Sequence, residues 1–250
     1  MLNKILKKII GNFGYKLIDK DLIKNDRLIS SHSFNSVEFA LEKIFSKDLV
    51  KSLIQIGAND GKRFDNLNKF IVKYSPLSIL VEPIKTNFQD LKKNYKNQKN
   101  IYFENSAISV NNEIQYLYKV RDNKIINYEE HIKGITSFDI DHLTKHGVIR
   151  SHIEKEKVNS ISILNLLLKY NINNLDLLMI DAEGYDAEIS IDFLKNTKLR
   201  PIIILEYIHI KNKLFKILID LLTKKNFYFL KINENLICFP KENELLKKNF

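Results

Sequence analysis

The sequence has 250 residues, 44% hydrophobic and 28% charged, which is the composition of a globular chain able to bury one sizeable core. The single cysteine, Cys238, excludes an internal disulfide and fits a reducing, cytoplasmic location. The net charge of +10 comes mainly from lysine, which argues against a nucleic-acid partner and favours an anionic substrate.

Residues 1–48 are predicted to form an N-terminal helical cap. Apolar residues share one helical face at Leu2, Ile5, Leu6, Ile9 and Ile10, and lysines occupy the other face. This pattern favours a helix that packs on the domain or in a homodimer, with peripheral membrane contact as the alternative. No run reaches the roughly 20 apolar residues of a membrane span, and no signal-peptide pattern stands at the start.

From residue 49 to residue 250 the pattern predicts one α/β domain. Strands are expected at 50–56, 77–83, 101–109, 175–184 and 201–208, an antiparallel strand at 113–120, and a closing pair in "FYFLKI" and "LICFP". Helices are expected up to about residue 74, over 85–96, after Ser160 or Ser162, and over 213–225. Apolar strands that alternate with helices indicate a mostly parallel sheet covered on both faces, with an antiparallel strand inserted at its edge.

Polar and small residues follow four of these strands, and a parallel sheet brings such positions to one edge. Gly57 and Gly61, with Ala58 and Asn59 between them, form a turn that lets a ligand approach the main chain. Glu82 follows the second strand, where a carboxylate can bind a ribose diol. The remaining residues at this edge are Asn105, Ser106 and Ala107, which border a flat base, and Asp181 and Glu183 beside the same crevice.

The turn reads G-A-N-D-G and lacks the G-x-G-x-x-G spacing of a dinucleotide site. Carboxylates repel a diphosphate and attract a sulfonium, so the pattern favours S-adenosyl-L-methionine over NAD. An NAD(P)-type Rossmann enzyme and a non-catalytic protein that keeps the fold are the alternatives.

The stretches "LIQIGANDGKRFD", "ILVEP", "NSAIS", "GITSF" and "LLMIDAEGYD" resemble the FkbM family of S-adenosylmethionine-dependent methyltransferases over about residues 50–210. The resemblance implies a class I methyltransferase fold with seven strands and a reversed last strand. It also implies O-methylation of sugars, glycans or small metabolites. Matched residue by residue, it assigns Gly57, Asn59 and Gly61 to the methionyl end of the cofactor. It assigns Glu82 to the ribose, Ser106 and Ala107 to the adenine, and Asp181 to the region of the methyl donor.

Residues from about 121 to 157 match no motif and are predicted to form a lid or acceptor-binding insertion. His142, within it, is the first candidate for a general base or substrate orienter, with Asp181 and Glu183 as further catalytic candidates. Glu206 and His209 are candidates for acceptor contact. His142 and His146 have the i, i+4 spacing of zinc ligands, and Asp139, Asp141, Asp181 and Glu183 are the carboxylates that could hold a divalent cation. Without a third ligand at a diagnostic spacing, no metal site is predicted.

The acceptor is the least determined part of this prediction. A lysine-rich chain is compatible with phosphorylated or nucleotide-linked sugars, including precursors of surface polysaccharide such as capsule, and also with a neutral sugar. A phosphate or phosphoramidate oxygen is already anionic and would need cations around it, whereas an alcohol would need a base.

Overall fold

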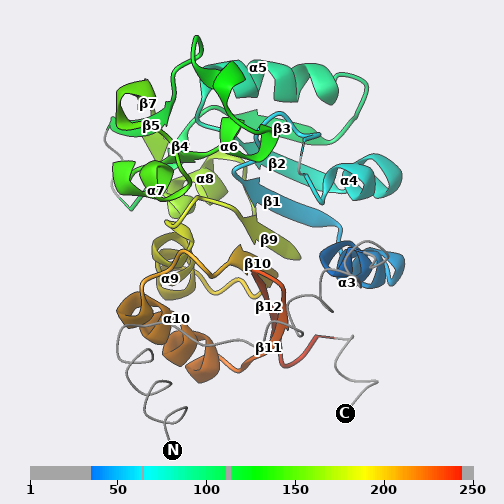
Figure 1. Ribbon diagram of the computed structural model, residues 1–250. Coiled ribbons are helices and arrows are strands. Elements are labelled where there is room, and N and C mark those ends of the chain that lie inside the picture. Colours follow the sequence, from blue (N-terminus) through cyan, green and yellow to red (C-terminus); the bar gives the residue numbers. More distant parts are fainter. Residues whose placement is uncertain (1–34, 64, 111–113, 244–250) are drawn as a thin grey trace, which may run out of the picture.

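The computed structural model describes residues 35–63, 65–110 and 114–243 of the chain (Figure 1). Within these ranges the strands of the main sheet are β1 (Ser52–Ile56), β2 (Leu77–Val81), β3 (Ile101–Glu104), β9 (Leu177–Ile180), β10 (Ile202–Glu206), β11 (Phe227–Ile232) and β12 (Asn235–Pro240). The helices around it are α3 (Ser36–Ser46), α4 (Asn68–Tyr74), α5 (Lys85–Asn94), α8 (Ile163–Lys169), α9 (Asp186–Asn196) and α10 (Asn212–Lys224). The amphipathic helix predicted near the N-terminus, with its membrane and dimer contacts, lies outside the described residues.

The seven strands follow the order β11-β12-β10-β9-β1-β2-β3. β1 pairs in parallel with both β2 and β9, whereas β12 is antiparallel to β10 and β11. The predicted α/β fold with an antiparallel C-terminal strand is therefore confirmed. The reversed strand lies one position in from the edge, because β12 inserts between β10 and β11.

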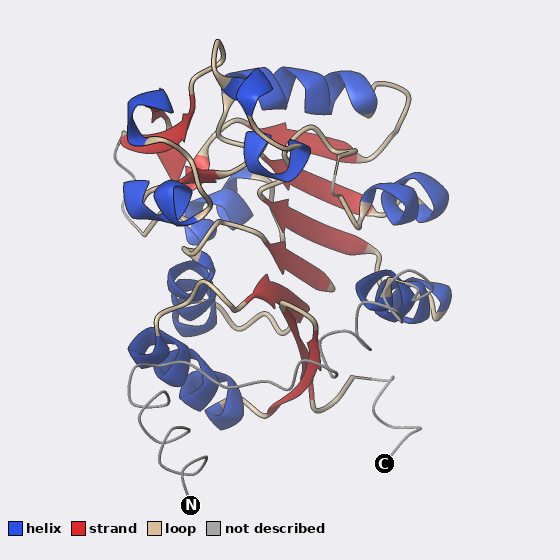
Figure 2. Ribbon diagram, viewed as in Figure 1, coloured by secondary structure: helices blue, strands red, loops and turns tan. Residues whose placement is uncertain are grey.

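Helices cover both faces of the sheet, as Figures 1 and 2 show. Successive strand residues alternate between the two sides: Ile54 and Leu178 pack in a core with α8, α9 and α10, and Leu53 and Leu177 in a core with α3, α4 and α5. On the second side Phe45 of α3 stacks on Phe70 of α4 with ring centroids 5.0 Å apart. The second half of the predicted N-terminal cap thus shares its core with the sheet.

The third strand is shorter than the single run predicted over 101–109. It ends at Glu104, and Ala107–Ile108 form a separate strand, β4, that pairs with β8 (Ser160–Ile161). The break has a local cause. The Asn105 side-chain amide donates to the carbonyls of Glu82 and Pro83, and the Ser106 hydroxyl donates to Glu104. These bonds direct the chain away from the sheet at its carboxyl edge. Of the two serines predicted to cap the next helix, Ser160 and Ser162, it is Ser162 that caps α8.

The region between β4 and β8 forms a small second sheet, β6-β5-β7. Its strands are β5 (Gln115–Val120), β6 (Thr136–Ser137) and β7 (Ile153–Val158), and it carries helices α6 (Glu130–Lys133) and α7 (Ile140–Lys145). The antiparallel strand predicted at 113–120 is confirmed as β5. The insertion has its own apolar cluster around Val120, Leu143 and Ile153. Its role as an acceptor lid stays a prediction.

Candidate functional site

The glycine turn after β1 is shaped by close contacts within the protein. Gly57, Asn59 and Gly61 have φ values of +80°, +47° and +70°. A Cβ atom on Gly57 would lie 1.9 Å from the Asp181 carbonyl oxygen, and one on Gly61 within 2.6 Å of Leu91 and Tyr95 side-chain atoms. Both positions therefore exclude a side chain for reasons of packing as well as backbone conformation. Gly57 lines the cavity described below, whereas Gly61 is buried against α5.

Glu82 holds this turn in place. Its carboxylate accepts hydrogen bonds from the backbone N–H groups of Asn59 and Ile84, at 2.9 and 2.8 Å. Only 4% of Glu82 is exposed, and this burial raises the pKa of its carboxyl group to about 7 in spite of the two hydrogen bonds. Glu82 is thus a structural element of the turn and also a wall of the adjoining cavities.

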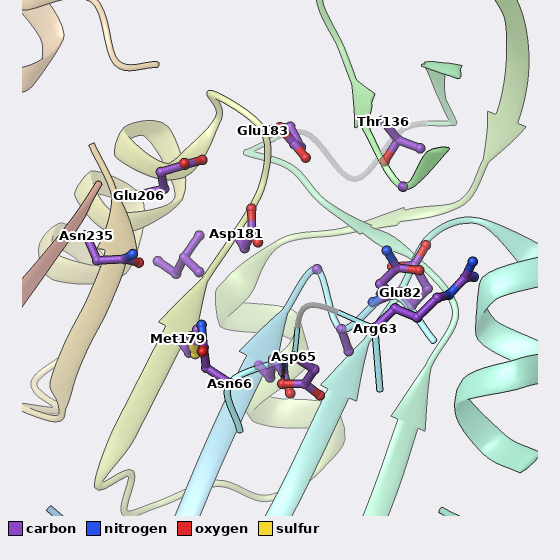
Figure 3. A pocket seen from close by; sticks show the side chains of 16 residues that line it. Arg63, Asp65, Asn66, Glu82, Thr136, Met179, Asp181, Glu183, Glu206 and Asn235 are labelled. Atoms are coloured by element: carbon purple, nitrogen blue, oxygen red, sulfur yellow. Dashed lines mark hydrogen bonds between the residues drawn. The ribbon is translucent and has the colours of Figure 1, made fainter. Parts of the chain in front are cut away.

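Two adjoining cavities lie at the carboxyl ends of β1, β2 and β9. The first holds about 850 Å³ of empty space, counting its opening to solvent, and the second about 440 Å³. They share Gly57, Glu82, Thr136, Asp181 and Glu183 in their linings. Because the two cavities share these walls, they are treated together and called here the donor cavity. Figure 3 shows Asp181, Glu183 and Glu206 on one side of the first part and Glu82 and Arg63 on another.

The donor cavity brings together most of the residues predicted to bind the cofactor. Gly57, Ala58 and Asn59 line its first part. Ser106 and Ala107 line its second part, beside the apolar side chains of Ile108, Leu117 and Phe138. Gly61 and His142 lie outside both linings. Asn105 lines neither part, and its side-chain amide donates to the backbone carbonyls of Glu82 and Pro83.

The first part of the cavity is strongly acidic. Five carboxyl groups line it, from Asp65, Glu82, Asp181, Glu183 and Glu206, against the single guanidinium of Arg63. Asp181 is exposed to the open cavity, but protein atoms crowd around it, and this desolvation together with the charge of Glu183 raises its pKa to about 7. Burial, together with the charge of Asp181, raises the pKa of Glu206 to about 8. A cationic ligand would relieve this repulsion, whereas a diphosphate would increase it.

Two buried acceptors in the first part have no hydrogen-bond partner among the described residues. They are the side-chain oxygens of Gln55 and Asn59. Such oxygens are stabilised by a donor from a ligand or water, because an unpaired buried acceptor costs about 1–3 kcal/mol. An ammonium group supplies such donors, and the acidic lining accepts its charge. The donor cavity therefore fits the methionyl and sulfonium groups of S-adenosyl-L-methionine.

Several lining residues were not predicted from the sequence, among them Gln55, Arg63 and Asp65. Gln55 interrupts the apolar run of β1, and its amide donates to Asp65 at 3.1 Å. Asp65 in turn accepts the backbone N–H of Leu67, and Arg63 pairs with Asp60. A buried polar residue inside an apolar strand was the one available signal, at Gln55. Arg63 and Asp65 lie in the irregular segment between β1 and α4, and no sequence pattern indicates that this segment lines the cavity.

His142 approaches the site from the insertion. Its Nε2 lies 2.9 Å from a carboxylate oxygen of Glu183, and only 8% of the residue is exposed. Ser137, in the "GITSF" stretch, donates from its hydroxyl to the backbone carbonyl of Glu183 at 3.0 Å. The predicted catalytic residues His142, Glu183 and Asp181 are therefore contiguous. Glu183 lines the donor cavity and also the cavity that contains His142.

A family model of the methyltransferase FkbM domain matches residues 55–229, well over half of the chain. The chain belongs to the FkbM methyltransferase family. The match runs from within β1 into β11 and so includes every lining residue named above. The fold is that of a class I methyltransferase, as the sequence resemblance implied.

Several solved structures are similar to this chain at low identity. The methyltransferase FkbM from Methylobacillus flagellatus KT is 10% identical with a TM-score of 0.45, and the alignment covers 76% of this chain and 44% of that chain. A Methanococcus jannaschii fibrillarin pre-rRNA processing protein is 12% identical with a TM-score of 0.38, covering 76% and 66%. A human methyltransferase 10 domain containing protein is 9% identical with a TM-score of 0.40, covering 82% and 80%. This chain thus spans less than half the length of the Methylobacillus protein. A search among curated proteins finds no match. None of the described helices is long and apolar enough to cross a membrane.

Proposed function

We propose that this FkbM-family protein transfers a methyl group from S-adenosyl-L-methionine to an oxygen of a small sugar-like acceptor that carries an anionic group. The observation that carries the proposal is the donor cavity itself. It joins an acidic part with unpaired buried acceptors to an apolar part bordered by Ser106 and Ala107. These two parts match the cationic methionyl end and the flat adenine end of the donor.

Each part of the donor would contact particular residues of the donor cavity. Asn59 and Gln55 would accept from the α-ammonium group, and Arg63 would pair with the α-carboxylate. Glu82 would accept from the ribose hydroxyls, because it lines both parts of the cavity. Asp181, which also lines both parts, would lie near the sulfonium. When bound, the donor supplies an electrophilic methyl group whose bonding pair leaves with sulfur.

The acceptor would occupy the neighbouring cavity, called here the acceptor cavity. Its lining includes His142, Glu183, Glu188, His209, Lys145 and Lys211. Both lysines are exposed, so they are available to an anionic group such as a phosphate. One carboxylate oxygen of Glu188 is buried there without a partner among the described residues, and it can accept from a hydroxyl. These contacts support a phosphorylated or nucleotide-linked sugar, the class to which precursors of surface polysaccharide belong.

His142 and Glu183 would accept the proton that the acceptor hydroxyl loses. As the new C–O bond forms and the C–S bond breaks, a hydroxyl acceptor loses its proton, and the pair would pass that proton on to solvent. The partly buried hydrogen bond between His142 and Glu183 would orient the imidazole for this role. An acceptor oxygen that is already anionic, as in a phosphate or phosphoramidate, needs no such base and would depend on the two lysines.

Calorimetry with S-adenosyl-L-methionine and with NAD, on the same preparation, tests the donor. Binding of the first and none of the second is expected, and the reverse would refute the proposal. A panel of neutral sugars, sugar phosphates and nucleotide sugars, read out by release of S-adenosylhomocysteine, then tests the acceptor. Turnover confined to the anionic members is expected, and turnover of the neutral sugars alone would refute the anionic class.

A further inference from the structure

Three histidines meet at the boundary of the acceptor cavity. His142 lies on α7, His146 caps the end of that helix, and His209 comes from the loop between β10 and α10. Their ring centroids are 4.8 Å (His142 to His146), 4.5 Å (His142 to His209) and 5.2 Å (His146 to His209) apart. The fold thus adds a third imidazole to the i, i+4 pair visible in the sequence.

The donor atoms of this cluster are close enough to share one ion. One ring nitrogen from each of the three histidines lies within 4.8 Å of the other two. In a second group, one carboxylate oxygen each from Glu183 and Glu206 and one ring nitrogen of His209 also lie within 4.8 Å of one another. The ligand atoms of a tetrahedral zinc ion lie ~3.4 Å from one another, so shifts of ~1 Å in the positions of the three ring nitrogens would allow them to bind one ion. The two aspartates of the insertion have partners of their own. Asp139 caps α7 by accepting from Asp141, and Asp141 pairs with Arg150.

The loops that carry the cluster are fixed by buried contacts. Asp186, fully buried, accepts from the backbone N–H groups of Gly184 after β9 and Glu206 at the end of β10. Glu183 is held at a φ of +48°, a conformation that few side chains adopt. Gly184 packs 3.6 Å from the His209 Cβ, measured from its own ideal Cβ position. A residue kept in such a conformation by its surroundings is characteristic of ligand sites.

From this geometry we infer that His142, His146 and His209 bind a divalent transition-metal ion of the zinc class. Three imidazoles favour zinc, cobalt or nickel over magnesium and calcium, which prefer oxygen ligands. Glu183 is the carboxylate partner of His142, as metal-bound imidazoles commonly have. Three protein ligands leave a fourth position, which is the arrangement of a catalytic zinc site rather than a structural one.

His142 and His209 line the acceptor cavity, so an ion held by the three histidines would lie beside the acceptor, bind its oxygen and lower the pKa of its hydroxyl group. This role rests on the proposed function, whereas ion binding does not. The proton lost from the hydroxyl would pass to solvent. In this arrangement His142 acts as a ligand rather than a base, and Glu183 orients its imidazole through their hydrogen bond.

Binding is tested on the full chain without a polyhistidine tag, with Zn²⁺ and Co²⁺ as probes and no other ligand. We expect one equivalent of Zn²⁺ by calorimetry, and the visible absorption of four-coordinate Co²⁺. His209→Ala should weaken binding at least ~10-fold and remove the absorption. His152→Gln is the matched control, because His152 bonds Tyr128 within the insertion and lies outside the cluster. Zn²⁺ should raise the Tm of the wild type and of the control, but not that of His209→Ala.

Equal Zn²⁺ affinity in His209→Ala and His152→Gln would overturn the inference, as would a wild type that binds neither ion. If His209→Ala does not fold, His146→Ala replaces it, and retained Co²⁺ absorption in that variant would overturn the inference equally. S-adenosyl-L-methionine binding is measured separately in the presence of a chelator. A failure of donor binding there refutes the proposed function and leaves the metal site standing, whereas the opposite pattern refutes the metal site alone.

Discussion

The ideal Cβ position of Gly57 lies 1.9 Å from the carbonyl oxygen of Asp181, so the turn after β1 and the loop after β9 meet through bare backbone. The contact places the two loops that carry the donor cavity at a fixed separation. It also explains why the first glycine of the turn is required even before a ligand is considered.

Gly57→Ala should destabilise the protein by about 1–3 kcal/mol more than Gly147→Ala. Both glycines have positive φ, at +80° and +84°, so each substitution carries a similar backbone penalty. A Cβ on Gly147 meets nothing within 4 Å, whereas one on Gly57 meets the Asp181 carbonyl. Urea denaturation of the two variants measures the difference. Equal losses of unfolding free energy would show that the loops separate easily.

Glu82→Ala should weaken S-adenosyl-L-methionine binding by about 1–3 kcal/mol, because charged hydrogen bonds to the ribose and to the turn are lost together. Glu82→Gln separates these effects, since its amide oxygen can still accept one backbone N–H. Asp220→Asn is the control, on the exposed side of α10 and outside both cavity linings. Calorimetry measures all three. Unchanged affinity in Glu82→Ala would remove this residue from the donor site.

The ligand-free protein should lose stability as the pH rises from 5 to 9. The pKa values of Glu82 and Asp181 are raised to about 7 and that of Glu206 to about 8. Each therefore lies above its unfolded value of about 4, so its stabilising contribution is complete below pH 4 and is lost as the pH passes 7–8.

Replacing one of these carboxyl groups should reduce that slope. Glu206→Gln, which cannot ionise, is expected to lose about 1–3 kcal/mol less than the wild type between pH 5 and pH 9. Denaturation curves at four or five pH values measure this. Parallel profiles for the two proteins would mean that Glu206 ionises normally in the folded state.

Lys211→Gln should raise KM for a phosphorylated acceptor about 10-fold and leave KM for a neutral acceptor unchanged, because a charge-assisted bond to the anion is lost. Added salt should reduce the difference, since exposed charges are screened. Lys216→Gln is the matched control on the exposed face of α10. If both variants behave alike with the phosphorylated acceptor, the lysine of the acceptor cavity does not bind the anion.

The fold and the donor half of the site were predictable from the amino-acid pattern alone. Apolar runs alternating with helices predict a parallel sheet, and a parallel sheet brings every strand end to one edge. Gly57, Glu82, Ser106 and Asp181 therefore had to lie close together, whatever the lengths of the helices between them. The early end of β3 was not visible, because it depends on side-chain bonds from Asn105 and Ser106.

The acceptor side depended on tertiary structure. His142 lies in the insertion and His209 follows β10, and no periodicity relates one to the other. Their contact is set by the way the insertion packs against the ends of β9 and β10, with Ser137 bonded to the Glu183 backbone. Strand ends obey a repeating geometry that local sequence encodes, whereas the path of an irregular insertion is decided by contacts between distant residues. For that reason the sequence alone determined that Gly57, Glu82 and Asp181 line one cavity at the sheet edge. The packing of the insertion decided which residues face that cavity from the other side.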